Sequence, residues 1–164
     1  MQKADQVEQA VIECAKSIAA RAATEKWPSD RIWTGDLISA LGKLGQERKY
    51  YVCGKHGHKY GGQDEWLYDL VWLLQSRDGI IVDVPLILES EWGVKSKDGR
   101  EDFEKLLLSR AQHRVMVFQQ RSDMKRICNQ YIEQVQRFGL TQAGDRYLFV
   151  GFDYTAIKSE LYVA

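Results

Sequence analysis

The sequence has little proline, no long apolar run and no excess of charge of either sign. Only two of its 164 residues are proline, and 23 basic residues balance 23 acidic ones. This balance argues against attraction of the whole chain to nucleic acid, so any such contact must use local basic patches. No apolar run approaches the roughly 18 residues that a membrane span needs. We therefore expect no membrane partner.

Cysteine is also scarce, and two common catalytic motifs are missing. Cys14, Cys53 and Cys128 are an odd, widely spaced set, which favours free thiols in a reducing compartment, so we expect a cytoplasmic protein. The first 20 residues are amphipathic and carry acids, unlike a signal peptide. The chain has no glycine-rich phosphate loop with Lys-Ser/Thr and no G-x-S-x-G. P-loop nucleotide hydrolysis and the α/β-hydrolase reaction therefore have no motif here.

Hydrophobic periodicity predicts alternating helices and strands within one domain. The length suits a single domain, which we divide into N-terminal helices over 4–45, a core over 48–120, and a C-terminal helix and strand over 122–155. The expected helices cover 4–24, a short segment 36–45 that Gly45 stops, a segment that Asp102 caps, and 123–138. The expected strands cover 48–53, 65–76, 79–92, 113–119 and 146–154.

The strongest local signal is a hairpin that brings acidic residues together. Asp78-Gly79 separates two apolar runs, and Asp-Gly between strands is typical of a tight hairpin turn. A turn centred near Gly79 places Asp69 opposite Glu89, and alternation along the strand puts Glu91 on the same face as Glu89. Asp83 is a competing acid, but it would lie at the far end of the hairpin, so we prefer Asp69.

Acids gathered on an apolar hairpin need something to neutralise them. Two unit charges about 4 Å apart repel by roughly 4 kcal/mol at an effective dielectric near 20. Shared protons, salt bridges and divalent cations held by carboxylate oxygens are three solutions. The sequence leaves open a metal site, a structural pairing, or a two-carboxylate hydrolase that works without metal through a raised pKa.

The order of these elements and acids resembles the PD-(D/E)XK nuclease superfamily. Asp69 matches the first acid of its motif and Glu89 the second, while Glu91 stands where a lysine is usual. The resemblance implies an α/β, restriction-endonuclease-like fold, with a central mixed β-sheet of about five strands flanked by helices. It implies Mg²⁺-dependent, or Mn²⁺-dependent, hydrolysis of phosphodiester bonds, with DNA as the expected substrate and RNA left open.

The same resemblance assigns roles to individual residues. Asp69, Glu89 and Glu91 would be the metal-binding carboxylates, and the backbone carbonyl of Ser90 would be a further ligand. Glu91 could also act as the base toward the attacking water. Because the usual lysine is replaced, Lys105 in the following helix is the candidate for contacting that water or a phosphate. An acid from the first helix, Glu8 or Glu13, could be added, and spacing does not choose between them.

Two basic segments are candidates for contact with nucleic acid. The glycine-rich loop after residue 53 and the segment after Trp92 supply these residues: Lys55, His56, His58, Lys59, Lys95 and Lys97. An alternative, a zinc site at Cys53, His56 and His58, lacks a fourth ligand. A small chain without net charge is expected to act as a homodimer or with a partner that delivers the target. A catalytically inactive nuclease fold, working as a nucleic-acid-binding or protein-interaction module, is the alternative function.

Overall fold

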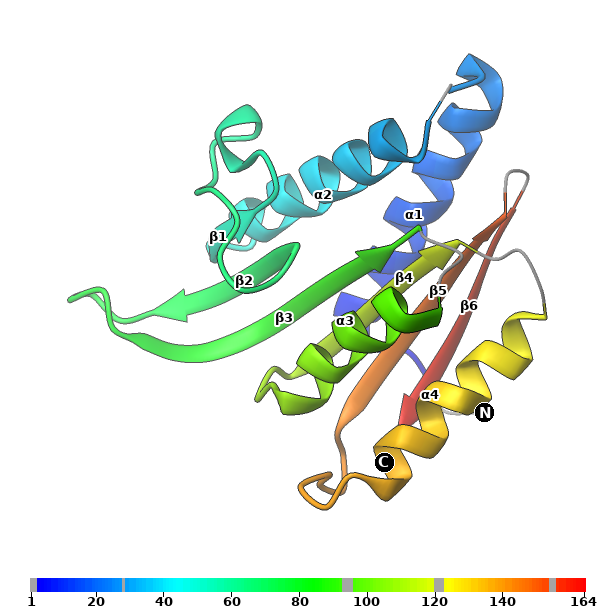
Figure 1. Ribbon diagram of the computed structural model, residues 1–164. Helices are drawn as coiled ribbons and strands as arrows, with labels where there is room; N and C mark the ends of the chain where they lie inside the picture. Colours follow the sequence, from blue (N-terminus) through cyan, green and yellow to red (C-terminus); the bar gives the residue numbers. More distant parts are fainter. Residues whose placement is uncertain (1–2, 28, 93–95, 120–122, 154–155) are drawn as a thin grey trace.

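The computed structural model describes residues 3–27, 29–92, 96–119, 123–153 and 156–164. Within these residues the chain is an α/β protein with four α-helices and one six-stranded mixed sheet (Figure 1). No helix in the described ranges is long and apolar enough to cross a membrane. All three cysteines are free, as the sequence predicts.

The elements follow one another in the order α1, α2, β1, η1, β2, β3, α3, β4, α4, β5, β6. The helices are α1 (Gln6–Glu25), α2 (Asp30–Glu47), the 3₁₀ helix η1 (Gly57–Lys59), α3 (Ser96–Leu108) and α4 (Met124–Arg137). The strands are β1 (Tyr51–Gly54), β2 (Leu70–Gln75), β3 (Ile81–Glu91), β4 (His113–Gln119), β5 (Arg146–Asp153) and β6 (Ala156–Val163).

The sheet is covered by helices on both faces. Its strands lie in the order in which they occur in the chain, and β3, β4 and β5 are parallel while the other neighbours are antiparallel. Leu86 and Leu88 of β3 pack with α1 and α2, whereas Ile87 packs with α3 and α4. Alternate residues of one strand thus serve two cores, as expected for a central strand with both faces buried. Figure 1 shows α3 and α4 on one side of the sheet and α1 and α2 on the other.

The β2–β3 hairpin has the predicted register at its acidic end. Leu70 pairs with Leu88 and Val71 with Ile87, the alignment that a turn centred on Gly79 produces. Gly79 has φ +82°, a left-handed conformation that glycine adopts without strain. The register shifts only nearer the turn, where Leu74 pairs with Asp83. Asp69 immediately precedes β2, so it lies at the N-terminal end of the strand rather than within it.

Three predictions about elements are wrong. The second helix runs from Asp30 to Glu47 and passes through Gly45, whose φ is not left-handed. This glycine does not end the helix but lets the ring of Trp72 approach it closely. Asp102 lies inside α3, which begins at Ser96, so it is not the N-cap. The sheet has a sixth strand, β6, which none of the predicted elements covers. None of the described β6 side chains is fully buried, so this edge strand carries little apolar signal.

The start of α1 is attached to the sheet by a polar cluster of Asp5, Glu8, His113 and Arg146. Asp5 and Glu8 form a capping box at the helix N-terminus. Glu8, fully buried, also accepts hydrogen bonds from the Arg146 guanidinium at 2.8 and 2.5 Å. The His113 ring lies 2.7 Å from both the Asp5 carboxylate and the Pro85 carbonyl. His113 therefore contacts the N-cap residue of α1, and the cluster joins the first helix to β4 and β5.

Candidate active site

Asp69 is held at the entry to β2 by two residues from neighbouring strands. Its Oδ2 accepts hydrogen bonds from the Ser90 backbone N–H at 2.9 Å and from the Ser90 hydroxyl at 2.5 Å. Its Oδ1 forms an ion pair with the Lys55 ammonium, which follows β1. The hydrogen bond and the charge of Asp69 outweigh burial and raise the pKa of Lys55. Asp69 is only 4% exposed, so these partners satisfy a carboxylate that water barely reaches.

Glu89 lies on β3 next to this group and is only 1% exposed. Burial, and then the negative charge of Asp69, raise the pKa of Glu89 to about 8. The Lys105 ammonium, 3.2 Å from Glu89 Oε1, lowers that pKa but does not offset the other two effects. At neutral pH, and with no added cation, this carboxyl therefore keeps its proton in much of the population.

Lys105 reaches Glu89 from α3, the helix that follows β3. Its ammonium lies 2.7 Å from the Asp102 carboxylate, three residues earlier on the same helix. Burial lowers the pKa of Lys105, but the hydrogen bond to Asp102 and the charge of Glu89 raise it more, so the lysine stays charged. Spacing within one helical turn thus presents a fixed cation to the carboxylates.

The structure brings together four of the five residues that the sequence assigns to the catalytic centre. Ser90 and Lys55 bind Asp69, and Lys105 binds Glu89, whose pKa is raised in part by the charge of Asp69. Glu91 lies two residues beyond Glu89 and is half-buried. Its charge acts on α4, where it contributes, after burial, to raising the pKa of Tyr131 to about 12. Glu8 and Glu13 of α1 bind Arg146 and Lys16 instead of joining this group.

The donor set suits a hard divalent cation. Mg²⁺ prefers carboxylate and carbonyl oxygens. Asp69 and Glu89 both offer carboxylate oxygens, and they are near enough for the charge of Asp69 to raise the pKa of Glu89. Glu89 Oε1 is buried and has no hydrogen-bond partner of good geometry among the described residues, although Lys105 lies nearby. An orphaned carboxylate oxygen is costly, and a cation would satisfy it. Asp69 fits less simply, because a cation would have to displace or share the Lys55 ammonium.

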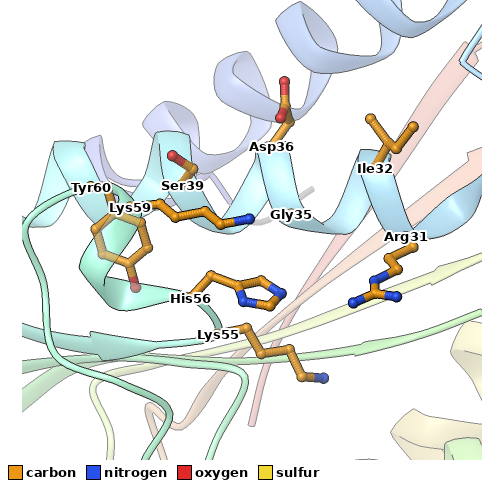
Figure 2. Close-up of a pocket in the computed structure, with 9 residues that line it drawn as sticks. All are labelled: Arg31, Ile32, Gly35, Asp36, Ser39, Lys55, His56, Lys59 and Tyr60. Atoms are coloured by element: carbon orange, nitrogen blue, oxygen red, sulfur yellow. The ribbon is translucent and has the colours of Figure 1, made fainter.

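The predicted basic residues are only partly described. Lys95, and the side chains of His58 and Lys97, lie outside the described residues. Lys55, His56 and Lys59 line a hollow of about 320 Å³ against α2 (Figure 2). Arg31 of α2 lines the same hollow, and the sequence prediction missed it because the second helix was expected to begin only at residue 36.

Two other possible metal groups are weaker. Cys53 packs in the core on the α3 and α4 side, whereas His56 lines the hollow beside α2, so the predicted zinc ligands diverge. Ligand atoms of Asp5, Glu8 and His113 lie within 4.8 Å of one another. These atoms already cap α1 and bind Arg146, which supplies the positive charge that a cation would bring.

Comparisons with known proteins found no match: no family model, curated protein or solved structure is similar enough to assign this chain to a family.

Proposed function

We propose that this protein is a Mg²⁺- or Mn²⁺-dependent nuclease of restriction-endonuclease-like fold, with DNA as its principal substrate. The observation that carries the proposal is the buried pair Asp69 and Glu89, at the end of a hairpin, with a lysine on each carboxylate. Two buried carboxyl groups at one place are costly to maintain, and pKa values raised in this way gather at functional sites. The three free thiols support a cytoplasmic location.

In this proposal each residue of the group has a defined task. Asp69 and Glu89 would hold the cation, with the Ser90 carbonyl as a further oxygen donor. The Ser90 N–H and hydroxyl orient the Asp69 carboxylate. Lys105 would hold positive charge beside the phosphate or contact the attacking water. A bound cation would stabilise charge on the phosphate and lower the pKa of the water that attacks it.

The raised pKa of Glu89 supplies a test that does not depend on cleavage. Because Glu89 retains its proton at neutral pH, binding of Mg²⁺ would release that proton, and affinity would rise with pH. Calorimetric titration with Mg²⁺ or Mn²⁺ in buffers of different ionisation enthalpy measures the released protons. We expect about one proton per bound ion near pH 7 and none in Glu89→Gln.

Cleavage of plasmid DNA is measured on the same samples. We expect nicking that EDTA abolishes and that Glu89→Gln loses without any fall in its melting temperature. Asp83→Asn is the matched control, because Asp83 is a carboxylate on the same strand bonded to Gln112 at the far end of the hairpin. Cleavage that survives EDTA would instead indicate a two-carboxylate hydrolase without metal, for which the raised pKa of Glu89 is also suitable.

A second candidate, a non-catalytic nucleic-acid-binding or protein-interaction module, is favoured by the two lysines. Lys55 and Lys105 already place a positive charge on each buried carboxylate, so the group can be stable without a metal. In that case wild-type protein would bind neither Mg²⁺ nor Mn²⁺ and would leave DNA and RNA intact. A homodimer is part of the nuclease proposal, and a light-scattering mass of one chain at high concentration would contradict it.

A further inference from the structure

The hollow beside α2 collects basic side chains from two parts of the chain. Arg31 comes from the first turns of α2, while His56 and Lys59 come from the loop after β1. Figure 2 shows the nitrogen atoms of these three side chains around one space below Gly35. Neither Arg31 nor Lys59 forms an ion pair with any other described side chain. Such a group suits an anion that has several acceptor oxygens.

The acid that lines this hollow is turned away from it. Asp36 points to the opposite side of α2 in Figure 2, and its carboxylate lies 3.1 Å from the Arg21 guanidinium of α1. Lys55 is bound to Asp69 and so is committed to the carboxylate pair. Among the described residues that line this first hollow, Asp36 is thus paired with Arg21 rather than with Arg31 or Lys59.

Gly35 keeps the space open, and packing does not explain it. A Cβ built on Gly42 or Gly45 of the same helix would meet the rings of Tyr60 and Trp72 at 2.5 and 2.6 Å. A Cβ on Gly35 would meet nothing within 4 Å, and its φ is not left-handed. A glycine inside a helix makes the helix less stable than an alanine would. At Gly35 no packing contact offsets this loss of helix stability, whereas the absence of a side chain preserves room in the hollow.

The hollow continues toward the candidate active site. A second hollow of about 360 Å³ shares Arg31, Gly35, Lys55 and His56 with the first. It extends to Ser90, which binds Asp69, and to Trp92. Glu65 is the acid on its wall. The two hollows together form a groove from Lys59 to Lys55 and Ser90, the two residues that bind Asp69.

We infer that this groove binds the sugar-phosphate backbone of a nucleic-acid strand, with one phosphate held by Arg31, His56 and Lys59 beside the phosphate that lies at Asp69 and Glu89. The inference rests on the proposed nuclease function for the identity of the ligand. It adds a subsite on α2 that would position the strand for cleavage. Inorganic phosphate and a mononucleotide present the same phosphate oxygens as a DNA strand, so the experiment compares binding of all three.

The experiment measures binding of a fluorescent DNA duplex, and of its single strand, by anisotropy in EDTA, where no cleavage occurs. We expect Arg31→Ala and Lys59→Ala each to weaken binding about tenfold, the effect of one charge-assisted hydrogen bond. Each should also reduce the slope of log affinity against log salt by about one phosphate contact. Gly35→Leu should weaken binding by filling the space. Its Cβ has no clash to cause unfolding, and melting temperatures check this.

The matched control is Arg137→Ala, which removes an exposed arginine from α4 on the other side of the sheet. If Arg31→Ala and Gly35→Leu bind DNA as Arg137→Ala does, with unchanged salt slope, the inference is wrong. Inorganic phosphate and a mononucleotide are titrated in parallel. Arg31-dependent binding of either one as tight as that of DNA would overturn the backbone assignment. Cleavage is assayed separately. Wild-type protein that binds DNA through Arg31 and Lys59 but does not cleave it would count against the proposed function alone.

Discussion

The two central carboxyl groups occupy unequal environments. Asp69 has an ammonium on one oxygen and two hydrogen-bond donors on the other. Glu89 has one lysine at 3.2 Å and an oxygen without a hydrogen bond, so burial dominates and its pKa rises to about 8. Two neighbouring carboxyls with different environments can take different roles in a reaction.

Replacing Glu89 by glutamine should remove a pH dependence of stability. The folded-state pKa of Glu89 lies above its ordinary value of 4.5, so the folded state binds the proton more tightly than the unfolded state. Wild-type stability should therefore fall as pH rises from about 4.5 to about 8, by an amount on the order of a few kcal/mol. Glu89→Gln cannot ionise, so in EDTA its melting temperature should exceed that of wild type at about pH 9 and converge with it near pH 5. Parallel melting curves across this range would contradict the raised pKa.

Replacing Lys105 by methionine should affect chemistry more than folding. The Lys105 side chain is 47% exposed, so the loss of its ion pairs should change stability by less than about 1 kcal/mol. Cleavage should fall by about 10² to 10³, the typical effect of removing one preorganised charge near the reacting phosphate. Lys125→Met, an exposed lysine of α4, is the control. An unchanged cleavage rate in Lys105→Met would exclude Lys105 from the catalytic group.

At the scale of elements, α2 connects the core to the groove. Its buried face includes Leu37, Ile38 and Leu41, which pack against the sheet, and its other face carries Arg31 and Gly35. Three glycines interrupt this helix, which is unusual for an element of 18 residues. Two of them allow close contact with Tyr60 and Trp72, and the third opens the groove. The same residue type thus has two different functions in one helix.

The same substitution at two of these glycines should change stability in opposite directions. Gly35→Ala should stabilise the protein by roughly 1 kcal/mol, because alanine favours the helix and its Cβ meets nothing within 4 Å. Gly45→Ala should destabilise it by about 1 to 3 kcal/mol, because a Cβ would lie 2.6 Å from Nε1 of the fully buried Trp72. Urea titration of both variants measures the two free energies of unfolding. The packing explanation would be wrong if both variants moved in the same direction.

At the scale of the whole molecule, the first helix is joined to the sheet by charge as well as by apolar contact. Glu8 and Arg146 are 138 residues apart in sequence and form a bidentate pair, with Glu8 fully buried. Asp5, the N-cap of α1, contacts the His113 ring at 2.7 Å. Burial raises the pKa of Asp5, but its hydrogen bonds with His113 and the backbone lower it more. The cluster fixes the position of α1 on β4 and β5.

Removing Arg146 should therefore destabilise the whole fold. Arg146→Met leaves Glu8 buried without its cation, and losing one partner of a buried pair typically costs 3 to 5 kcal/mol. The Arg146 side chain is 25% exposed, so we expect about 2 to 4 kcal/mol in chemical denaturation. Glu133→Gln breaks an exposed pair with Arg137 on α4 and should cost less than about 0.5 kcal/mol. Equal effects of the two variants on the free energy of unfolding would mean that the burial of Glu8 does not increase the cost of losing its partner.

Local patterns in the sequence were enough to predict the hairpin, its register at the acidic end, and the strand His113–Gln119. An Asp-Gly turn and period-two alternation act over a few residues, so they determine the pairing of Leu70 with Leu88, next to Asp69 and Glu89. The contact of Lys105 with Glu89 was also predictable, because Lys105 lies in the helix that directly follows the hairpin. The edge strand β6 was missed because none of its described side chains is fully buried.

Only the tertiary structure decided how the acidic group is neutralised and what surrounds it. The Lys55 ion pair with Asp69, the burial that raises the pKa of Glu89, and the meeting of Arg31 with His56 all depend on packing between separate elements. The bond between Glu8 and Arg146 spans most of the chain. Burial and charge at a point in space are sums over residues distant in sequence, so no local pattern contains them.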